Sequence, residues 1–447
     1  MRQTSDTIYA LSSGPGRGAV ALIRLSGVKA GEALARLCAQ PPGAARQAVV
    51  RRLHDPRTGE LLDQALTLWF PAPASFTGED MAELHVHGGR AVVAGVLDAL
   101  GSLEGLRPAE PGEFARRAFD HHRLDLVEAE ALADLVAAET AAQRRQALRQ
   151  LGGVLGKLYD EWRVAIIELM ALAEAGLDFS DQDLPAGLDD RLKRGILRLI
   201  AAISTHLDDG RRGELVREGL EIAILGPPNA GKSSLLNALA KREVAIVAAT
   251  AGTTRDVIEV RLDLSGYPVV LADTAGLRDA ADEVEAEGVR RALARAESAD
   301  LRLVVFDGAS WPVVDDKVIE LIDSNTIIVL NKRDLLQDNL KSHIIKGIKP
   351  LPLSCRTGEG LEELIAHLER AAASRMAEQA SPVLTQARHR LALEQCREAL
   401  VRSLGAPAVE LRAEDLRLAA RSLGRITGRV DVEDVLDQVF RSFCIGK

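Results

Sequence analysis

The fold of the middle of the chain is decided by one stretch, Glu221-Ile222-Ala223-Ile224-Leu225-Gly226-Pro227-Pro228-Asn229-Ala230-Gly231-Lys232-Ser233. Its mostly apolar beginning predicts a short buried β-strand. The remainder matches G-x-x-x-x-G-K-[ST], a loop whose backbone N–H groups cradle phosphates at the start of a helix. In this motif Lys232 reaches the β- and γ-phosphates, and the hydroxyl of Ser233 binds Mg²⁺. The stretch therefore predicts a strand, a phosphate loop and a helix, in that order.

Three more motifs follow in the order that a guanine-nucleotide domain requires. A strand-like run ends in Asp273-Thr274-Ala275-Gly276, where Asp273 would hold Mg²⁺ through water and the Gly276 N–H would meet the γ-phosphate. The apolar run 327–330 precedes Asn331-Lys332-Arg333-Asp334. A carboxylate at Asp334 accepts from guanine N1–H and N2–H₂, whereas adenine N1 is itself an acceptor and would repel it. Ser354-Cys355-Arg356, after a further strand, matches the last guanine-contacting loop, so the predicted nucleotide is GTP.

The residues expected to bind GTP lie in and beside these motifs. They are Asn229, Ala230, Gly231, Lys232, Ser233, Ser234, Ala248, Ala249, Thr250, Ala251, Gly252, Thr253, Thr254, Asp273, Thr274, Ala275, Gly276, Asn331, Lys332, Asp334, Ser354, Cys355 and Arg356. The segment 250–256 is the expected first switch, with Thr254 as the second Mg²⁺ ligand after Ser233.

Two departures from the Ras-like scheme bear on hydrolysis. Leu277 stands where Ras-like proteins place the glutamine that orients the attacking water. The phosphate loop carries Asn229, whose side-chain oxygen could bind a monovalent cation beside the phosphates. Such a cation would supply the positive charge that an arginine finger supplies elsewhere.

Outside the nucleotide motifs the pattern changes twice. Residues 1–119 read as mixed α and β, with strands near 19–25, 66–70 and 83–87 and a helix over 91–100. Helical periodicity runs from about 124 to 215 and returns beyond 383. We therefore expect an α/β multidomain chain: an N-terminal α+β domain, and an all-α domain into which a Ras-like P-loop G domain is inserted. The expected segments are 1–119, 120–215, 216–375 and 376–447.

Composition excludes several classes of protein. The 447 residues carry 56 Lys and Arg against 65 Asp and Glu, a net charge of −9, which argues against a surface coated in basic residues. Aromatic residues make up 3%, too few for an extended base-stacking platform. The four cysteines are far apart, and neither a signal peptide nor an apolar run of about 18 residues is present. We expect a reduced, cytoplasmic protein that does not enter the membrane.

Motifs near both ends of the chain make the assignment more specific. They are Gly16-Arg17-Gly18-Ala19-Val20-Ala21-Leu22-Ile23-Arg24-Leu25-Ser26-Gly27, Ser75-Phe76-Thr77-Gly78-Glu79-Asp80, Glu83-Leu84-His85-Val86-His87-Gly88-Gly89, Arg107-Pro108-Ala109, Pro111-Gly112-Glu113-Phe114 and Phe443-Cys444-Ile445-Gly446-Lys447. With the G motifs, the chain resembles, over nearly its whole length, the tRNA modification GTPases of the TrmE/MnmE type. These enzymes act on wobble uridine.

The resemblance implies a function and partners. The N-terminal domain would be similar to folate-binding one-carbon enzymes and would form a homodimer. With an FAD-dependent flavoprotein, in a heterotetramer, the chain would add an aminomethyl or carboxymethylaminomethyl group at C5 of the wobble uridine of certain tRNAs. The methylene carbon would come from a 5-substituted tetrahydrofolate, and GTP hydrolysis would be activated by K⁺ when two G domains pair.

The resemblance also implies roles for residues. The K⁺ ligands would be the side chain of Asn229 and the backbone carbonyls of Ala248, Thr250 and Thr253, although the family often has Thr at position 248. Glu285 would orient the attacking water through a second water, and Cys444 would act chemically in the modification. Folate would be bound by Arg24, Glu83, Arg123 and Lys447, with the family usually having Lys where Arg123 stands.

Two alternatives stay open at this point. Arg417, Arg421 and Arg425 recur every four residues, so they either meet tRNA phosphates or form a solvated helix face. The second functional reading is a regulatory or ribosome-assembly GTPase that binds rRNA without modifying it. Such proteins usually carry a basic RNA-binding module, which is not obvious in this sequence.

Overall fold

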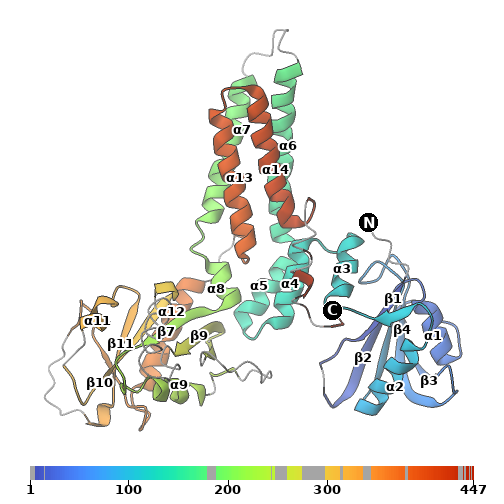
Figure 1. Cartoon of the computed structure of the whole chain (residues 1–447), viewed down its shortest axis with the longest axis horizontal. Helices are drawn as coiled ribbons and strands as arrows, with labels where there is room; N and C mark the ends of the chain where they lie inside the picture. The colour runs from blue at the N-terminus through green and yellow to red at the C-terminus, as the bar shows by residue number, and fades with distance from the viewer. Residues whose placement is uncertain are drawn as a thin grey trace, which may run out of the picture. The chain divides into compact units, whose positions relative to one another are not determined.

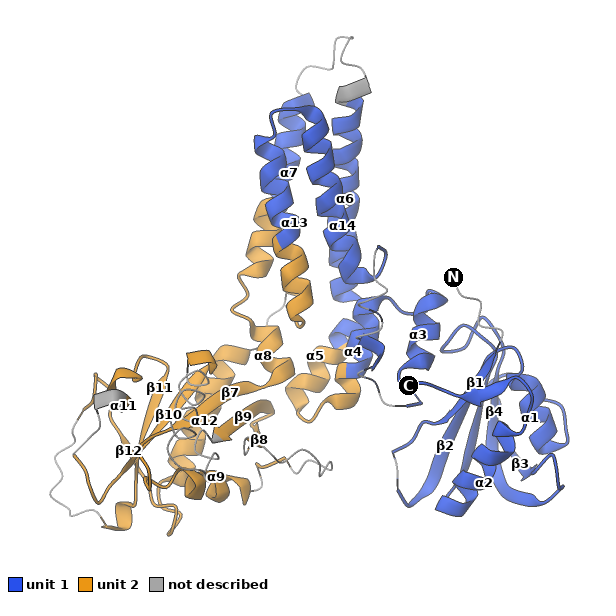
Figure 2. Ribbon diagram, in the orientation of Figure 1, with its two compact units in different colours: residues 1–133, 149–199, 395–447 blue, residues 134–148, 200–394 orange. Residues whose placement is uncertain are grey.

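The computed structural model describes most of the chain. The described residues are 6–14, 16–178, 188–242, 244–246, 259–273, 297–312, 316–335, 344–377, 381–430, 436, 439–441, 443 and 445–446. They form two compact units, coloured separately in Figure 2. Unit 1 comprises residues 1–133, 149–199 and 395–447, and unit 2 comprises residues 134–148 and 200–394.

The N-terminal part of unit 1 is a six-stranded sheet with helices on one face (Figure 1). The strands are β1 (Thr7–Leu11), β2 (Gly18–Ser26), β3 (Val49–His54), β4 (Leu61–Phe70), β5 (Met81–Gly88) and β6 (Leu106–Pro108), in the order β3-β4-β5-β2-β1-β6. Neighbouring strands are antiparallel except β1 and β6. The helices are α1 (Ala30–Cys38) and α2 (Arg90–Gly101). The predicted strands and the predicted helix of this region are confirmed.

Alternation along the strands decides which side chains this sheet buries. Ile23 of β2 and Leu84 of β5 are fully buried in one core with Leu34 of α1 and Leu100 of α2. Their neighbours in the two strands therefore point to the opposite face. That face receives polar side chains, among them Arg24.

The rest of unit 1 is helical, as predicted. Besides α1 and α2, the helices described outside the G domain are α3 (Glu113–Asp120), α4 (Leu126–Ala137), α5 (Ala141–Leu151), α6 (Val154–Asp178), α7 (Leu188–Leu207), α8 (Arg212–Glu218), α13 (Ala387–Gly405) and α14 (Val409–Thr427). Helices α6 and α14 pack side by side along their lengths (Figure 1). None of the helices within the described ranges is long and apolar enough to cross a membrane.

Unit 2 contains a second six-stranded sheet. Its strands are β7 (Leu220–Leu225), β8 (Glu259–Leu264), β9 (Tyr267–Asp273), β10 (Leu301–Asp307), β11 (Thr326–Asn331) and β12 (Leu351–Pro352), in the order β12-β11-β10-β7-β9-β8. All pairs are parallel except β8 with β9. The helices described are α9 (Lys232–Ala240), α11 (Asp316–Glu320) and α12 (Leu361–Met376), with a 3₁₀ turn at Arg333–Leu335. This is the predicted parallel-sheet nucleotide domain.

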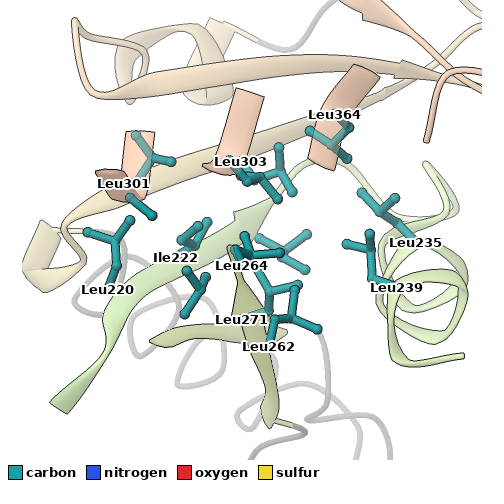
Figure 3. Close-up of a cluster of buried hydrophobic side chains, with 14 of the residues drawn as sticks. Leu220, Ile222, Leu235, Leu239, Leu262, Leu264, Leu271, Leu301, Leu303 and Leu364 are labelled. Atoms are coloured by element: carbon teal, nitrogen blue, oxygen red, sulfur yellow. The ribbon is translucent and has the colours of Figure 1, made fainter. Parts of the chain in front are cut away.

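The core of this sheet is aliphatic. Ile222 and Leu303 of the central strands pack with Leu235 of α9 and Leu364 of α12, and all four are fully buried (Figure 3). The fold class predicted from the sequence is confirmed: an α+β N-terminal region, a helical region, and a Ras-like sheet between its parts. The exact segment boundaries remain a prediction.

Candidate functional site: a guanine-nucleotide site at one edge of the sheet

The G motifs lie at one edge of the second sheet. The phosphate loop follows β7, the D-x-x-G motif begins at the end of β9, and N-K-x-D begins at the end of β11. The strand register places the ends of these strands next to one another: Asp273 pairs with Ile224, and Leu330 pairs with both Phe306 and Pro352. The carboxyl ends of parallel strands meet at one edge, which is where α/β sheets bind ligands.

Two glycines of the phosphate loop are sterically required. Gly226 has φ 141°, and a Cβ there would lie 2.1 Å from the carbonyl oxygen of Val305. Gly231 has φ 94°, and a Cβ there would lie 2.1 Å from Nδ2 of Asn331. Any larger residue would push the loop away from the sheet edge.

The phosphate-loop lysine lies across its own loop. Lys232 Nζ donates to the carbonyls of Gly226 at 2.8 Å and Pro227 at 3.0 Å. The side chain is 9% exposed, whereas Ser233 and Ser234 are exposed at the start of α9. The ammonium group is thus held against the phosphate loop, and its contact with the β- and γ-phosphates stays a prediction.

Asn331 ties two parts of the site together. Its buried side chain donates from Nδ2 to the carbonyl of Ala230 at 3.0 Å. Its Oδ1 accepts from the backbone N–H of Cys355 at 3.2 Å. The first residue of N-K-x-D therefore connects the phosphate loop with the last guanine loop.

Asp334 is held by the last loop. Its Oδ1 accepts from Ser354 Oγ at 2.6 Å, and its Oδ2 lies 3.8 Å from Arg356. The side chain is 21% exposed, so the carboxylate is partly open to solvent, and its contact with guanine stays a prediction. Burial raises the pKa of the Cys355 thiol to about 11 against a weaker opposing hydrogen bond from Asn331, so Cys355 offers its backbone rather than a thiolate.

Lys332 has a partner that the motifs did not reveal. Its Nζ contacts Asp307 Oδ2 at 2.6 Å, at the end of β10. Burial raises the pKa of Asp307, but the hydrogen bond and charge of Lys332 and the hydrogen bond from the N–H of Ala309 together outweigh burial and leave the pKa below its ordinary value. Only the position of an acid at a strand end signalled this residue, and many strand ends carry one.

A second group of predicted residues meets in the N-terminal sheet. Arg24 and Glu83 face each other in adjacent strands, and Arg24 Nε donates to Glu83 Oε1 at 2.9 Å. His85 Nε2 lies 3.5 Å from the other oxygen of Glu83, and the Arg24 guanidinium carbon lies 6.0 Å from the centre of the Phe76 ring. Arg123 lies beside the same loop, because a Cβ on Gly78 would lie 3.3 Å from its Cγ.

A buried ion network supports that loop. Arg117, 3% exposed, contacts Asp6 and Glu113 at 3.0 and 3.1 Å and Glu79 at 3.1 Å. Glu79 also accepts from Ser26 Oγ at 2.7 Å. Sequence reasoning missed Arg117 and Asp6, since the network joins positions about a hundred residues apart and no local spacing marks it.

The C-terminal motif is docked on the same sheet. Ser12 Oγ donates to the carbonyl of Gly446 at 2.8 Å, and Ile445 pairs with Pro111. Gly446 has φ 95°, and a Cβ there would lie 2.4 Å from the carbonyl of Leu11. Leu11 is the register partner of Ile23, which precedes Arg24 in β2, so Gly446 lies beside the part of the sheet that carries Arg24.

Several predicted residues lie outside the described residues. They are Ala248, Ala249, Thr250, Ala251, Gly252, Thr253, Thr254, Thr274, Ala275, Gly276, Leu277, Glu285, Cys444 and Lys447, and for Asp273 only the backbone is described. Their roles stay predictions. Within the described ranges, no three His, Cys, Asp or Glu side chains cluster as a metal site.

The strand–loop–helix phosphate site with N-K-x-D on the same edge defines a GTP-binding protein of the P-loop class. Comparison with known proteins makes this more specific. A family model described as "MnmE helical domain" matches residues 126–444, and one described as "GTP-binding protein TrmE N-terminus" matches residues 7–123. The chain belongs to the MnmE family of tRNA modification GTPases, which confirms the resemblance drawn from the motifs.

Individual relatives match over all or nearly all of their length. "tRNA modification GTPase MnmE" of Paramagnetospirillum magneticum is 57% identical over 443 residues, 99% of this chain and 100% of that protein. "5-taurinomethyluridine-[tRNA] synthase subunit GTPB3, mitochondrial" of Danio rerio is 48% identical over 467 residues, 99% of this chain and 93% of that protein. The solved G domain of the T. maritima FeoB iron transporter is 28% identical, covering 34% of this chain and 98% of that one, with a TM-score of 0.24. That score is too low to establish a shared fold over the chain.

Proposed function

We propose that the chain is the GTP-hydrolysing component of an enzyme that modifies the wobble uridine of certain tRNAs. With an FAD-dependent flavoprotein it adds an aminomethyl or carboxymethylaminomethyl group at C5. One observation carries the proposal: a GTP site and a polar Arg24–Glu83 site with the C-terminal motif docked beside it occur in a single chain. The name of the zebrafish relative, a synthase subunit, supports action together with a partner.

The metal ions in this proposal have suitable donors. Mg²⁺ would be held by the hydroxyls of Ser233 and Thr254, with Asp273 acting through water, and oxygen donors are what Mg²⁺ prefers. K⁺ would be held by Asn229 with the carbonyls of Ala248, Thr250 and Thr253. Asn229 has φ 62°, a conformation that Asn tolerates better than most residues, and it lies in the phosphate loop itself.

The folate proposal rests on the polar face of the N-terminal sheet. A pterin offers an amide N–H and an amino group to a carboxylate such as Glu83, which is 16% exposed. Arg24, Arg123 and Lys447 would meet the carboxylates of the glutamyl tail. Val20 and Val50, 59% and 60% exposed on strands of this sheet, support its burial in a homodimer.

Two residues would act on reacting groups. Glu285 would orient the water that attacks GTP, since Leu277 has no group to do so. Cys444 would act in the modification as nucleophile or acid. The docking of Ile445 and Gly446 near Arg24 supports this, because it brings the end of the chain to the proposed folate site.

The test is nucleoside analysis of tRNA from a deletion strain carrying the wild-type chain, Glu83→Ala or no chain. We expect the modified wobble uridine to disappear without the chain and to return only with the wild type. Normal tRNA nucleosides in the deletion strain, with a ribosome-assembly defect, would instead establish the rRNA-binding GTPase. Calorimetry with a 5-substituted tetrahydrofolate tests Glu83 directly, since one charge-assisted contact is worth about 1.5–3 kcal/mol.

A further inference from the structure

A pocket lies in unit 2 at the edge of the sheet opposite to the G motifs. Its volume is 310 Å³, at the lower end of the roughly 300–1,000 Å³ of small-molecule sites. It is lined by Asp300 and Asn325, which directly precede β10 and β11, and by residues at the start of α8 and in the last turn of α12. The G motifs follow the other ends of the strands, so this pocket is separate from the GTP site.

Positive charge gathers in this pocket. Its lining includes three arginines, Arg211, Arg212 and Arg375, against one acid, Asp300. The protein as a whole carries a net charge of −9, so the excess of arginine is a local feature. Guanidinium groups that share a concave site repel one another, and an anion between them relieves that repulsion.

The arginines have little compensating charge within the pocket. Arg211 contacts Glu214 at 2.7 Å, but that carboxylate is shared with an arginine of α13 at 2.8 Å. Arg375 donates to Oδ1 of Asn325 at 2.7 Å, and Asn325 is a neutral partner. The half-buried side chain of Arg212 has no hydrogen bond or ion pair with any residue in the part of the chain that the structure describes. Arg212 and Arg375 therefore have donors available for an anion.

Asp300 is fixed at the floor of the sheet. Its Oδ2 accepts from the backbone N–H of Glu221, in β7, at 3.0 Å. Burial, and to a lesser degree the charge of Glu221, raises the pKa of Asp300, although that hydrogen bond and the charges of Arg211 and Arg375 oppose the rise. The other carboxylate oxygen accepts no hydrogen bond from a described residue. It is an acceptor suited to a hydroxyl group of a ligand.

The backbone beneath Arg212 is held in place. Arg212 is the first residue of α8, and one face of α5 docks on this helix. Gln143 Nε2 donates to the carbonyl of Arg217 at 3.1 Å, and Gln146 Nε2 donates to that of Gly213 at 2.8 Å. The pocket is therefore formed in the absence of a ligand, which lowers the cost of binding one.

The arginines of α14 differ from those of the pocket. Arg417 contacts Glu174 at 2.8 Å and Glu414 at 3.2 Å. These two acids balance its charge, which favours the solvated helix face over a phosphate contact for this residue. Concavity and a shortage of carboxylates distinguish the arginines of α8 and α12.

We propose that this pocket binds the phosphate of a ribonucleotide, either free or within an RNA strand. Arg212 and Arg375 hold the phosphate, because planar guanidinium groups pair with phosphate oxygens. Asp300 accepts a hydrogen bond from a ribose hydroxyl, which distinguishes this ligand from inorganic phosphate. The inference goes beyond the proposed function, since it rests on this pocket alone.

The experiment measures binding of labelled uridine 5′-monophosphate to the full-length chain by equilibrium dialysis, with GDP in excess to occupy the GTP site. The variants are Arg212→Ala and Arg375→Ala, and Arg370→Ala is the matched control, an exposed arginine of α12 outside the pocket. Each pocket variant should lower the affinity for this nucleotide at least about tenfold, because a hydrogen bond to a charged group is lost, and the control should not. GDP affinity should be unchanged in all three, which shows that they are folded.

Further arms separate the two sources of the ligand. If excess tRNA displaces the mononucleotide, and tRNA binding also weakens in the pocket variants, an RNA strand reaches the pocket. If tRNA does neither, the ligand is a free nucleotide. Should an alanine variant lose GDP binding, the lysine variant at the same position replaces it, with a smaller expected loss.

Two results would count against the inference. If neither uridine 5′-monophosphate nor tRNA binds in a manner that depends on Arg212 and Arg375, the phosphate site is overturned. If inorganic phosphate binds as tightly as the nucleotide, the contact assigned to Asp300 is wrong. Neither result bears on GTP hydrolysis or on tRNA modification, so the proposed function is tested separately.

Discussion

At the scale of single residues, the GTP site depends on side chains that serve two loops at once. Asn331 satisfies the carbonyl of Ala230 and the N–H of Cys355, although neither of these loops belongs to its own motif. Gly231 owes its identity to the same contact, because its missing Cβ leaves room for Nδ2 of Asn331. The two motifs are therefore one structural unit, and a change in either should be felt by both.

Replacing Asn331 with Ala tests this unit. The change leaves the buried carbonyl of Ala230 and the N–H of Cys355 without their partner, which costs about 1–3 kcal/mol for each buried group left unpaired. We expect GDP affinity to fall at least tenfold and the G domain to unfold at lower denaturant. Asn325→Ala is the control, since the side chain of Asn325 accepts an exposed hydrogen bond from Arg375. Equal losses in the two variants would contradict the role of Asn331.

The cost of a left-handed backbone at position 231 can be separated from the clash that a Cβ there makes with Asn331. Gly231→Ala adds a Cβ at 2.1 Å from Asn331, whereas Gly358→Ala, at φ 83°, meets nothing closer than 3.8 Å. Both substitutions pay about 1–2 kcal/mol for the left-handed backbone. Only Gly231→Ala should also abolish nucleotide binding, as measured by fluorescent GDP titration. Retained binding in that variant would mean that the loop and Asn331 move apart at little cost.

At the scale of elements, many strands and loops could be predicted from the sequence, because the patterns that mark them are local. Apolar or alternating stretches of sequence predict the strands β2, β5, β7 and β11. The G-x-x-x-x-G-K-[ST] motif predicts the glycine-rich loop after β7. The network of Arg117 with Asp6 and Glu79 was not predictable, because it needs the register of β1 and the packing of α3. The docked face of α5 was hidden for the same reason: Gln143 and Gln146 look like surface residues until their carbonyl partners are known.

The Arg117 network should dominate the stability of the N-terminal domain. Asp6 and Glu113 are also bridged by Arg107, at 2.6 and 2.5 Å, so Arg117→Ala leaves these two acids one cation but takes the cation from Glu79. Breaking a buried ion pair from one side costs about 3–5 kcal/mol. Arg36→Ala is the control, since the Arg36–Glu32 pair is exposed and worth roughly 0–1 kcal/mol. Urea unfolding of the full chain, followed by a probe in this domain, measures both. A loss below about 1 kcal/mol in Arg117→Ala would show that the three acids find other partners.

The same network predicts that the folded protein loses stability at low pH. Burial raises the pKa of Asp6 and Glu113, but the hydrogen bonds and charges of Arg107 and Arg117, with the backbone N–H of Glu110 for Glu113, together outweigh it and leave both pKa values below their ordinary 3.8 and 4.5. Groups with a lowered folded pKa stabilise the protein above their unfolded pKa, and this contribution disappears as the pH falls through and below that range. We expect the melting temperature to drop below about pH 4.5, less steeply in Arg107→Ala. Parallel melting curves against pH in the two proteins would contradict this.

At the scale of the whole molecule, the chain holds a hydrolysis site and a proposed modification site in separate compact units. The end of the chain belongs to the unit without the GTP site, where Gly446 is docked on Ser12. A change in that motif should therefore separate the two activities. Cys444→Ser is expected to leave GTP hydrolysis near normal and to abolish tRNA modification, measured by turnover and by nucleoside analysis. Full modification by this variant in a deletion strain would remove the chemical role of Cys444.

Hydrolysis in the other unit raises the question of what replaces the missing glutamine. Leu277 offers no hydrogen bond to water, and an arginine finger is worth about 10³–10⁵ in rate where it exists. A cation held by Asn229 and the carbonyls near Thr250 would supply that charge in a water-poor interface between two G domains. The GTPase rate should then rise steeply in KCl over NaCl at equal ionic strength, because the loop must match one ionic radius.

Asn229→Ala should lose this difference, whereas Glu285→Ala should hydrolyse slowly yet keep GTP binding and K⁺-driven pairing, because Glu285 acts on the water. Equal wild-type rates in the two salts would sink the cation mechanism, and normal turnover in Glu285→Ala would leave that residue an ordinary exposed acid.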